Sequence, residues 1–416
     1  MNMFKKVIST VLVAAMALSI VACGSNSTTP AGSSAPAPSS SASSSAPAGS
    51  GETFKLGAYL QLTGNNAPVG IEANNSIKLA VKMINEQGGF NGQQIQYIPY
   101  DTQGSAEEAV KVVTKMMNTD KVNAVIGSVN SNEVLAAAGY LNDAKIYNFG
   151  LGTSSTWMKK DWPYVFRASF NNDFGAPKYA KILKDELKVE KAAVFYGQDD
   201  SSLSNGKTVV KTFEDAGIKV VAEETYDSGD VDFTAQVRNI INSGAQAVYA
   251  VIIANDGPLF VKQMRQNGWN GMIFYKDTWM AHQREIAGPE ASNYIVSVAP
   301  YVCYQSIDDC DIPLMKEFLE KYQAEYGSIP KTECAYRGWD TMMVLWEAAK
   351  KAGKNDSESL KAATETLKLD RLGGSFDYTV GDREGLHEMN AFIQIDGKNS
   401  SWEKWFTPEN YEAYKK

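Results

Sequence analysis

Short apolar runs alternate with helix-spaced apolar residues along the first part of the chain. The runs at 54–60, 95–99 and 122–126 have the length of strands, and continuous apolar runs are typical of strands buried on both faces. The first two are followed by segments, at 77–84 and 106–117, whose apolar residues recur with the spacing of an amphipathic helix. Strands that alternate with helices imply right-handed crossovers, so the pattern predicts an α/β fold with parallel sheets.

The alternation resumes further along the chain and repeats one unit. Strands are predicted at 164–168, 192–196, 218–225, 246–253, 272–275 and 294–299, and helices at 174–187, 205–216, 233–242 and 256–267. The apolar run 247–252, followed by Ala254, Asn255 and Asp256, has the order of strand, polar loop and helix that begins at 122. This unit therefore occurs once in each half, as expected for two similar lobes.

The length beyond the N-terminal segment also indicates two lobes. From Thr53 onward about 360 residues remain, which is too many for a single hydrophobic core. The C-terminal part mixes predicted helices near 312–326 and 338–352 with a strand at 391–395, so we expect it to complete both lobes. The expected boundaries are 53–172 with 301–378 for lobe 1, and 173–300 with 379–416 for lobe 2.

The N-terminus has the pattern of a secretory signal over residues 1–22. Two lysines precede the apolar run 7–21, which is shorter than the ~20 apolar residues that a membrane span needs. The run ends at Ile20-Val21-Ala22-Cys23, which resembles a lipobox, where cleavage leaves Cys23 lipid-modified. A membrane-spanning anchor with an incidental cysteine is the alternative. The following segment, within 23–52, is nearly all Ser, Ala, Pro, Gly and Thr and predicts an unfolded tether.

Charge argues against several classes of partner. The formal net charge is −8, and removal of Lys5 and Lys6 with the signal would take it to −10. An acidic protein without a basic cluster is poorly suited to nucleic acid or to anionic lipid surfaces. We therefore expect no nucleic-acid partner, and contact with the membrane only through the lipid on Cys23.

Cysteine and histidine positions give no pattern of a metal or cofactor site. Cys303 and Cys310 are close enough in sequence to form a disulfide, but Cys334 makes a third and the pairing stays open. The two histidines, His282 and His387, are isolated, and no Cys or His pair has the spacing of metal ligands. We expect neither a metal nor a cofactor.

Two polar loops in the first half are the strongest candidate for a binding site. The strand at 122–126 runs into a loop over 128–132 and then a helix, and a predicted strand at 146–149 runs into the glycine- and hydroxyl-rich loop 150–155. Both loops would lie at the carboxyl ends of neighbouring parallel strands, where open α/β sheets bind ligands. A helix N-terminus favours an anion, so a carboxylate would fit. The alternative is that Ser131, Asn132, Thr153 and Ser154 only cap helices.

Several phrases, spread in order along the chain, resemble those of the periplasmic branched-chain amino-acid-binding proteins, the type I solute-binding proteins of ABC importers. The resemblance implies an α/β type I periplasmic-binding-protein fold, with two Rossmann-like lobes of parallel sheet joined by a hinge of three crossings. The phrases are Phe54-Lys55-Leu56-Gly57, Leu62-Thr63-Gly64, Ile84-Asn85-Glu86-Gln87-Gly88-Gly89-Phe90-Asn91-Gly92, Val125-Ile126-Gly127-Ser128, Pro163-Tyr164-Val165-Phe166-Arg167 and Asp232-Phe233-Thr234-Ala235-Gln236.

The resemblance also implies how the two charged ends of an amino acid are held. Its carboxylate would be bound by Ser131 and by the loop residues Gly152, Thr153 and Ser154, and its ammonium group by Asp277 from the other lobe. Each charged end loses water on binding and needs hydrogen bonds in exchange. Dividing the ends between lobes would make the ligand favour the closed state. The alternative for Asp277 is a solvated loop carboxylate.

The side-chain pocket is where the sequence departs from the family. Tyrosines of the branched-chain binders align with Val69, Leu203 and Ile253 here, so the pocket would be larger or differently shaped. An aliphatic amino acid remains the expected ligand, while aromatic or polar amino acids and small amides stay open. The residues expected around the side chain are Val69, Asn130, Leu203, Ile253, Trp279 and Tyr336.

Together these features predict a monomeric, lipid-anchored binding protein on the outer face of the cell membrane that delivers an amino acid to an ABC permease. A ligand-sensing receptor module of the same fold is the alternative. We do not expect an enzyme, because no histidine is placed to activate Ser131 or Ser154 and no phosphate-binding Gly-Lys-Ser/Thr loop occurs.

Overall fold

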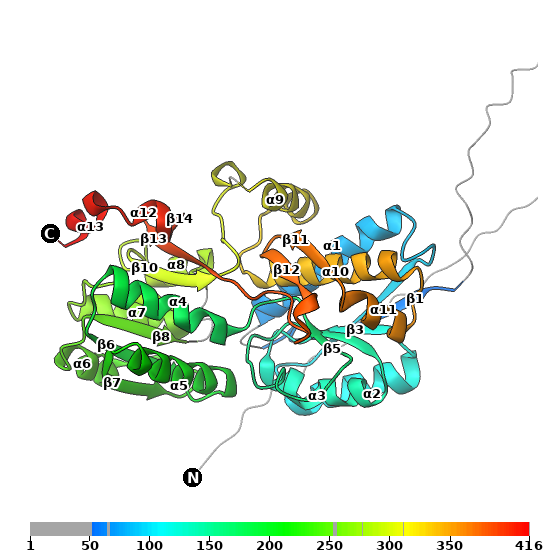
Figure 1. The fold of residues 1–416 in the computed structure, drawn as a ribbon, viewed down its shortest axis with the longest axis horizontal. Coiled ribbons are helices and arrows are strands. Elements are labelled where there is room, and N and C mark those ends of the chain that lie inside the picture. Colours follow the sequence, from blue (N-terminus) through cyan, green and yellow to red (C-terminus); the bar gives the residue numbers. More distant parts are fainter. Residues whose placement is uncertain (1–51, 65–66, 253–255, 277, 311, 416) are drawn as a thin grey trace, which may run out of the picture. The chain divides into compact units, whose positions relative to one another are not determined.

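A computed structural model describes residues 52–64, 67–252, 256–276, 278–310 and 312–415 (Figure 1). All of them belong to one compact unit, Ala48–Lys416. The predicted signal peptide, the tether with Cys23, and the site residues Ile253 and Asp277 lie outside the described residues.

The first sheet has five strands in the order β2-β1-β3-β4-β5, and all its pairs are parallel. Ile126 of β3 pairs with Phe149 of β4, so the loops that follow these two strands leave the sheet at the same level. The strands are β1 (Phe54–Leu60), β2 (Ile95–Asp101), β3 (Ala124–Gly127), β4 (Tyr147–Gly150) and β5 (Val165–Arg167), and the helices between them are α1 (Ala67–Glu86), α2 (Ala106–Lys115) and α3 (Ser131–Asp143).

The second sheet has seven strands in the order β14-β13-β10-β9-β8-β6-β7. Its last two strands in sequence run antiparallel to their neighbours, and the others pair in parallel. The strands are β6 (Lys191–Gly197), β7 (Lys219–Tyr226), β8 (Ala247–Val251), β9 (Ile273–Tyr275), β10 (Ile295–Ala299), β13 (Asn390–Ile395) and β14 (Lys398–Ser401). The helices are α4 (Gly175–Lys181), α5 (Asp200–Asp215), α6 (Thr234–Asn242), α7 (Asp256–Gln266) and α8 (Ala281–Ala287).

Three segments connect the part of the chain around the first sheet, called lobe 1 below, with lobe 2 around the second. They are the first crossing (168–174), the second crossing (300–310) and the third crossing (381–389). The predicted alternation of helices with parallel strands is confirmed, while the exact lobe boundaries stay a prediction.

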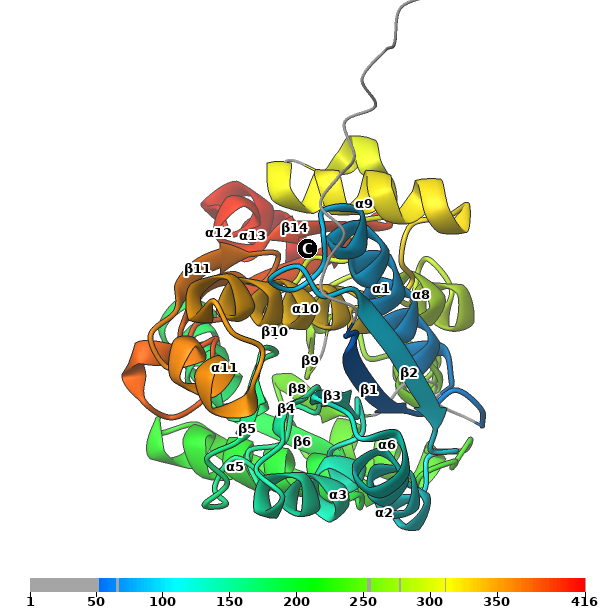
Figure 2. The ribbon, with the colours of Figure 1, turned by 90° about the vertical axis from the view of Figure 1, so that its right-hand side faces the viewer.

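Between the second and third crossings the chain returns to lobe 1. There α10 (Cys334–Ala352) lies alongside α1 (Figure 2). The approach is close, because a Cβ atom on Gly338 would lie 2.6 Å from the carbonyl oxygen of Ala73. The remaining elements here are α9 (Pro313–Tyr326), α11 (Ser357–Thr364), β11 (Lys368–Arg371) and β12 (Gly374–Asp377), and α12 (Trp402–Trp405) and α13 (Pro408–Tyr414) follow β14.

Most predicted elements are present, but three helices begin earlier than predicted. Helix α1 begins at Ala67 instead of 77. Helix α5 begins at Asp200 instead of 205, because the side chain of Asp199 caps it by accepting from the backbone N–H of Ser202 at 3.0 Å. Helix α10 begins at Cys334 instead of 338. Its first turn is fully buried, so it lacks the polar face that reveals an amphipathic helix.

Among the described residues no disulfide joins Cys303, Cys310 and Cys334, which are all buried. The disulfide between Cys303 and Cys310 that the sequence left open is therefore not formed here. Within the same described ranges, no helix combines the length and the apolar character needed to cross a membrane.

Candidate functional site

The loop after β3 leads into a helix N-terminus whose backbone N–H groups face no capping side chain. Asn130 is the N-cap residue of α3, and its side chain makes no cap hydrogen bond. Instead its amide nitrogen donates to Gln61 Oε1 and to Glu133 Oε1, both at 2.8 Å. The first N–H groups of a helix have no partner inside the helix, and the helix dipole favours negative charge there. This end of α3 is suited to an anion.

The loop after β4 packs directly against that helix start. The backbone N–H of Ser154 donates to Ser131 Oγ at 3.1 Å. A Cβ atom on residue 152 would lie 2.7 Å from Ser131 Oγ and 3.0 Å from its Cα, so only glycine allows this approach. A serine hydroxyl that accepts one hydrogen bond can still donate its own proton. The two predicted loops therefore form one polar site with a hydroxyl donor at its centre.

Ser131 does not occupy the N-cap position of α3, and its role in ligand binding stays a prediction. Ser131 is the first residue of α3 and follows the N-cap, and its Oγ bonds the neighbouring loop. Ser154 Oγ accepts from the backbone N–H of Thr156 at 3.2 Å, which shapes the loop locally. Ser131, Thr153 and Ser154 are each buried, so a ligand that reached them would exchange water for protein contacts.

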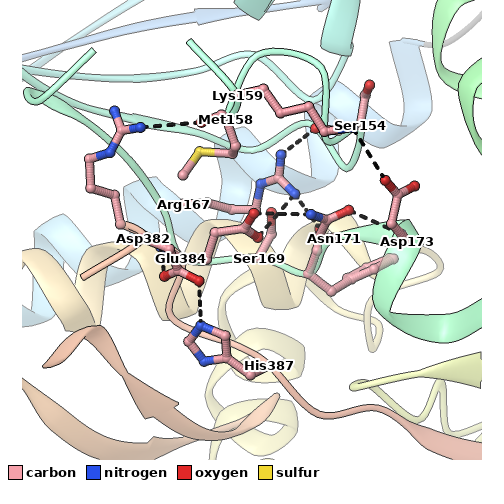
Figure 3. A network of polar contacts seen from close by, with 12 residues as sticks. Ser154, Met158, Lys159, Arg167, Ser169, Asn171, Asp173, Asp382, Glu384 and His387 are labelled. Carbon is pink, nitrogen blue, oxygen red and sulfur yellow. Dashed lines mark hydrogen bonds and ion pairs between the residues drawn. The ribbon is translucent and has the colours of Figure 1, made fainter. Parts of the chain in front are cut away.

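Two buried arginines hold the carbonyl groups of the loop after β4. Arg337 of α10 donates to the carbonyl oxygen of Leu151 at 3.3 Å, and Arg167 of β5 donates to that of Ser154 (Figure 3). Burial lowers the pKa of Arg167 to about 10, which leaves it charged near neutral pH. In the sequence Arg167 ends an apolar strand and one of the phrases that carry the family resemblance, but our site prediction did not include it.

Glu133, in the first turn of α3, is a second buried group that our site prediction missed. Its side chain is 1% exposed. Burial raises its pKa, the hydrogen bond from the Asn130 amide acts in the opposite direction, and the nearby carboxylate of Asp101 adds to the rise. A raised pKa favours the neutral form, which reduces repulsion of an anion at the start of α3.

A segment of lobe 2 reaches lobe 1 beside this region. The backbone N–H of Glu333, next to the start of α10, donates to Met280 Sδ at 3.4 Å, and Met280 packs within the hydrophobic core of lobe 1. Thr278 Oγ1 donates to the carbonyl oxygen of Tyr301 in the second crossing at 3.0 Å. Asp277 is not among the described residues, so its proposed role stays a prediction.

The residues predicted to surround the ligand side chain occupy different environments. Val69 lies on α1, partly buried against the core of lobe 1. Leu203 lies on α5 and is 38% exposed. Trp279 and Tyr336 are buried in the cores of lobe 2 and lobe 1 respectively. Ile253 is not described. The structure thus does not bring these side chains together in one lobe, and their assignment to the pocket stays a prediction.

Across the described ranges, no group of three or more His, Cys, Asp or Glu side chains is arranged to hold a metal ion. The groups observed at the two loops are hydroxyls and backbone N–H groups, two buried arginines and the carboxyl group of Glu133.

The known proteins that this chain resembles are binding proteins. A model of the periplasmic binding protein family matches residues 53–399. The leucine-, isoleucine-, valine-, threonine- and alanine-binding protein of Pseudomonas aeruginosa is 25% identical over 341 residues, which cover 79% of this chain and 89% of that protein.

Two solved structures share the fold. The branched-chain amino acid transporter substrate binding protein LivJ of Streptococcus pneumoniae, in complex with isoleucine, has a TM-score of 0.74 and 23% identity, covering 84% of this chain and 99% of LivJ. A solute binding protein of an ABC transporter from R. palustris, in complex with benzoate, has a TM-score of 0.74 and 22% identity, covering 84% of this chain and 96% of that one. The predicted type I fold is confirmed, and this chain belongs to the periplasmic binding protein family.

Proposed function

We propose that this protein is an extracytoplasmic solute-binding protein of an ABC importer that captures an amino acid between its lobes. The observation that carries the proposal is the junction of Ser131 Oγ with the backbone N–H of Ser154 at the start of α3. It combines hydroxyl donors, backbone N–H groups and a helix N-terminus, which is the chemistry that a carboxylate requires. The names of the P. aeruginosa relative and of LivJ support an aliphatic amino acid as the ligand.

In this proposal the two lobes hold opposite ends of the ligand. Ser131, Gly152, Thr153 and Ser154 of lobe 1 bind the carboxylate, and Asp277 of lobe 2 binds the ammonium group. A ligand that contacts both lobes only when they are closed stabilises the closed state by its differential affinity for that state. The contact of Met280 with lobe 1 supports an approach of this part of lobe 2.

We further propose that a signal peptide over residues 1–22 directs export and that Cys23 carries a lipid. The uncharged segment 24–51 would then tether a monomeric binding protein to the outer face of the membrane, with a typical reach of roughly 30 Å. A body held at this distance could deliver its ligand to a permease in the same membrane.

An aromatic carboxylic acid is the second candidate ligand. The R. palustris relative was solved with benzoate, and a site built for a carboxylate would serve either class. The two classes differ at the other end of the ligand, because an aromatic acid has no ammonium group and gives Asp277 no role.

A thermal-shift screen of the purified protein tests the proposal. The panel contains the twenty amino acids, benzoate, 4-hydroxybenzoate and small amides. A ligand at one hundred times its dissociation constant adds about 2.7 kcal/mol of stability, which raises the unfolding temperature measurably. We expect leucine, isoleucine or valine to stabilise the protein. Stabilisation by benzoate alone would favour the second candidate, and no response to any carboxylate would contradict both.

The Asp277→Ala variant tests the ammonium site directly by titration calorimetry. Removal of one partner of a buried charge pair costs about 2–5 kcal/mol, so we expect amino-acid affinity to fall at least thirtyfold. Glu285→Ala, which removes an exposed carboxylate on α8 of the same lobe, is the matched control. Undiminished affinity in Asp277→Ala would show that another group binds the ammonium.

A further inference from the structure

The buried side chain of Arg167 contacts both the proposed ligand loop and the connections between the lobes. Its Nη2 donates to the carbonyl oxygen of Ser154. Its Nη1 donates to the carbonyl oxygen of Phe170 in the first crossing at 3.4 Å and to Glu384 Oε2 in the third crossing at 3.3 Å. One guanidinium therefore joins three segments that are separate in sequence, as Figure 3 shows.

Glu384 extends this network to a second residue of the first crossing. Its Oε1 accepts from Asn171 Nδ2 at 3.0 Å. The side chains of Arg167 and Glu384 are 0% and 7% exposed, respectively, so the pair has little contact with water. Loss of one partner from a buried ion pair leaves an uncompensated charge, which is strongly unfavourable.

Backbone hydrogen bonds attach the third crossing to the edge of the lobe 1 sheet. The N–H of Arg167 donates to the carbonyl oxygen of Arg383 at 3.0 Å, and the N–H of Gly385 donates to that of Arg167 at 3.1 Å. This makes residues 383–385 a short neighbour of β5. These bonds do not depend on the side chain of residue 384, so a substitution there can test the ion pair separately from the fold.

The third crossing also holds the far end of the connection between β4 and β5. Arg383 Nη2 donates to the carbonyl oxygens of Met158 at 3.2 Å and Lys160 at 3.0 Å. The guanidinium of Arg167 lies over the ring of Trp157, 4.2 Å from its centroid. From Ser154 to Lys160 the connection is thus held by Arg167, which is bonded to the third crossing, and by Arg383, which lies in it.

We propose that Arg167 and Glu384 are positioning residues that couple the loop 151–155 to the first and third crossings. In this role neither residue needs to contact the ligand. The pair fixes the carbonyl of Ser154, and thereby the N–H of Ser154 and the hydroxyl of Ser131, in an arrangement that depends on the position of the crossings. This inference rests on the proposed function, in which the loop binds a carboxylate.

Hydrogen–deuterium exchange of the ligand-free protein tests the coupling without any ligand. We compare wild type with Glu384→Gln and with Glu388→Gln, the matched control, which changes an exposed glutamate of the same crossing. In Glu384→Gln we expect amide exchange in peptides covering 151–157 to be about 2-fold to 30-fold faster. Mutations within networks of coupled residues typically change the coupling by factors in this range. Peptides of β6 and β8 should be unchanged. Unchanged exchange at 151–157 would overturn the proposal.

The double variant Arg167→Met with Glu384→Met separates positioning from stability. Replacing a buried ion pair by apolar side chains is often neutral for stability, so this variant should fold even if Glu384→Gln does not. We expect its unfolding temperature to lie near that of wild type, while exchange at 151–157 remains fast. Wild-type protection of the loop in this variant would show that the pair is only structural.

Calorimetric titration with L-leucine tests whether the Arg167–Glu384 pair affects ligand binding. We expect Glu384→Gln to bind leucine about 2-fold to 30-fold more weakly than wild type, and Glu388→Gln to bind like wild type. Wild-type leucine affinity in Glu384→Gln, together with faster exchange at 151–157, would contradict the claim that the pair affects ligand binding. If wild type itself does not bind leucine or any other amino acid, the proposed function fails, while the exchange experiment still decides the positioning claim.

Discussion

The unit of strand, loop and helix occurs in both lobes, but the neighbouring strand contributes something different to each copy. In lobe 1, β3 and α3 meet the loop after β4, where Gly152 lies against Ser131. In lobe 2, β8 and α7 meet Tyr275 of β9, whose hydroxyl donates to the carbonyl oxygen of Ile252 at 3.1 Å. A Cβ on Gly257 would lie 2.1 Å from that hydroxyl.

The same local fold therefore gives two different surfaces. Lobe 1 places the buried hydroxyl of Ser131 beside the loop of Gly152, and lobe 2 places the hydroxyl of Tyr275 beside Gly257, where Gln283 Nε2 donates to it at 2.9 Å. Parallel strands determine where a site can form. The two units differ in the residue at or just beyond the end of the next strand, which is Gly152 after β4 and Tyr275 at the end of β9.

We expect the largest effect when one glycine in each unit of strand, loop and helix is replaced by alanine. Gly152→Ala would place Cβ against Ser131 and displace the loop, removing at least two hydrogen bonds to a charged ligand at about 1.5–3 kcal/mol each. We expect leucine affinity to fall more than about 100-fold. Gly257→Ala should instead lower the free energy of unfolding by about 1–3 kcal/mol through overpacking and leave affinity within a few-fold. Calorimetric titration and urea unfolding of both variants measure this difference.

If Gly257→Ala weakened binding as much as Gly152→Ala, the two units would be equally part of the site, and the contrast drawn between them would be wrong.

A serine pair within lobe 1 sharpens the contrast between a ligand site and a helix cap. Ser105 caps α2 by accepting from the N–H of Glu108 at 3.3 Å, so Ser105→Ala should cost about 0.5–2 kcal/mol of stability and leave affinity unchanged. Ser131→Ala should weaken leucine binding about 10-fold to 150-fold. Equal leucine affinity of Ser105→Ala and Ser131→Ala would mean that Ser131 has only a structural role.

The lobes also differ in their buried charges, which predicts a pH effect from lobe 1. Burial raises the pKa of Asp340 to about 7, against the hydrogen bonds from the N–H groups of Gly373 and Leu372. Between the ordinary aspartate pKa and this value, the folded protein keeps a proton that the unfolded chain releases. The stability that Asp340 contributes is therefore fully present below the ordinary aspartate pKa and is lost as pH rises toward 7.

Unfolding temperatures between pH 5 and pH 8 measure this dependence. We expect a fall of a few degrees in wild type and a smaller fall in Asp340→Asn, which cannot titrate. The raised pKa values of Glu72 and Glu384 act in the same direction, so some slope should remain. Asp370→Asn, at an exposed position on β11, is the control. The same slope in all three proteins would exclude Asp340 as a source.

The smallest effect on stability should come from the predicted side-chain pocket. Leu203 is 38% exposed on α5, so Leu203→Ala should change the free energy of unfolding by less than about 0.5 kcal/mol. Val69 packs partly against the lobe 1 core, and Val69→Ala should cost more. If both residues line the pocket, both variants should change the order of preference among leucine, isoleucine and valine in a thermal-shift panel. Unchanged preference would remove them from the pocket.

The sequence predicted the alternation of elements and the two loops because both depend on local patterns. Strand β1 has the predicted bounds, Phe54–Leu60, and the loops around Ser131 and Ser154 do meet. Short elements such as α8 (Ala281–Ala287) were missed, since seven residues give too few turns to show a period. The pair of Arg167 and Glu384 was missed because its members are 217 positions apart, and no local pattern links them.

The central claim is that Ser131 and the loop of Ser154 bind a carboxylate. Titration calorimetry of wild type and Ser131→Ala, each with L-leucine and with L-leucinamide, tests it most directly, because the amide lacks the carboxylate but keeps the ammonium group and the side chain. We predict that the mutation weakens leucine binding about 10-fold or more and changes leucinamide binding by much less. An equal loss of affinity for both ligands would mean that the carboxylate lies elsewhere.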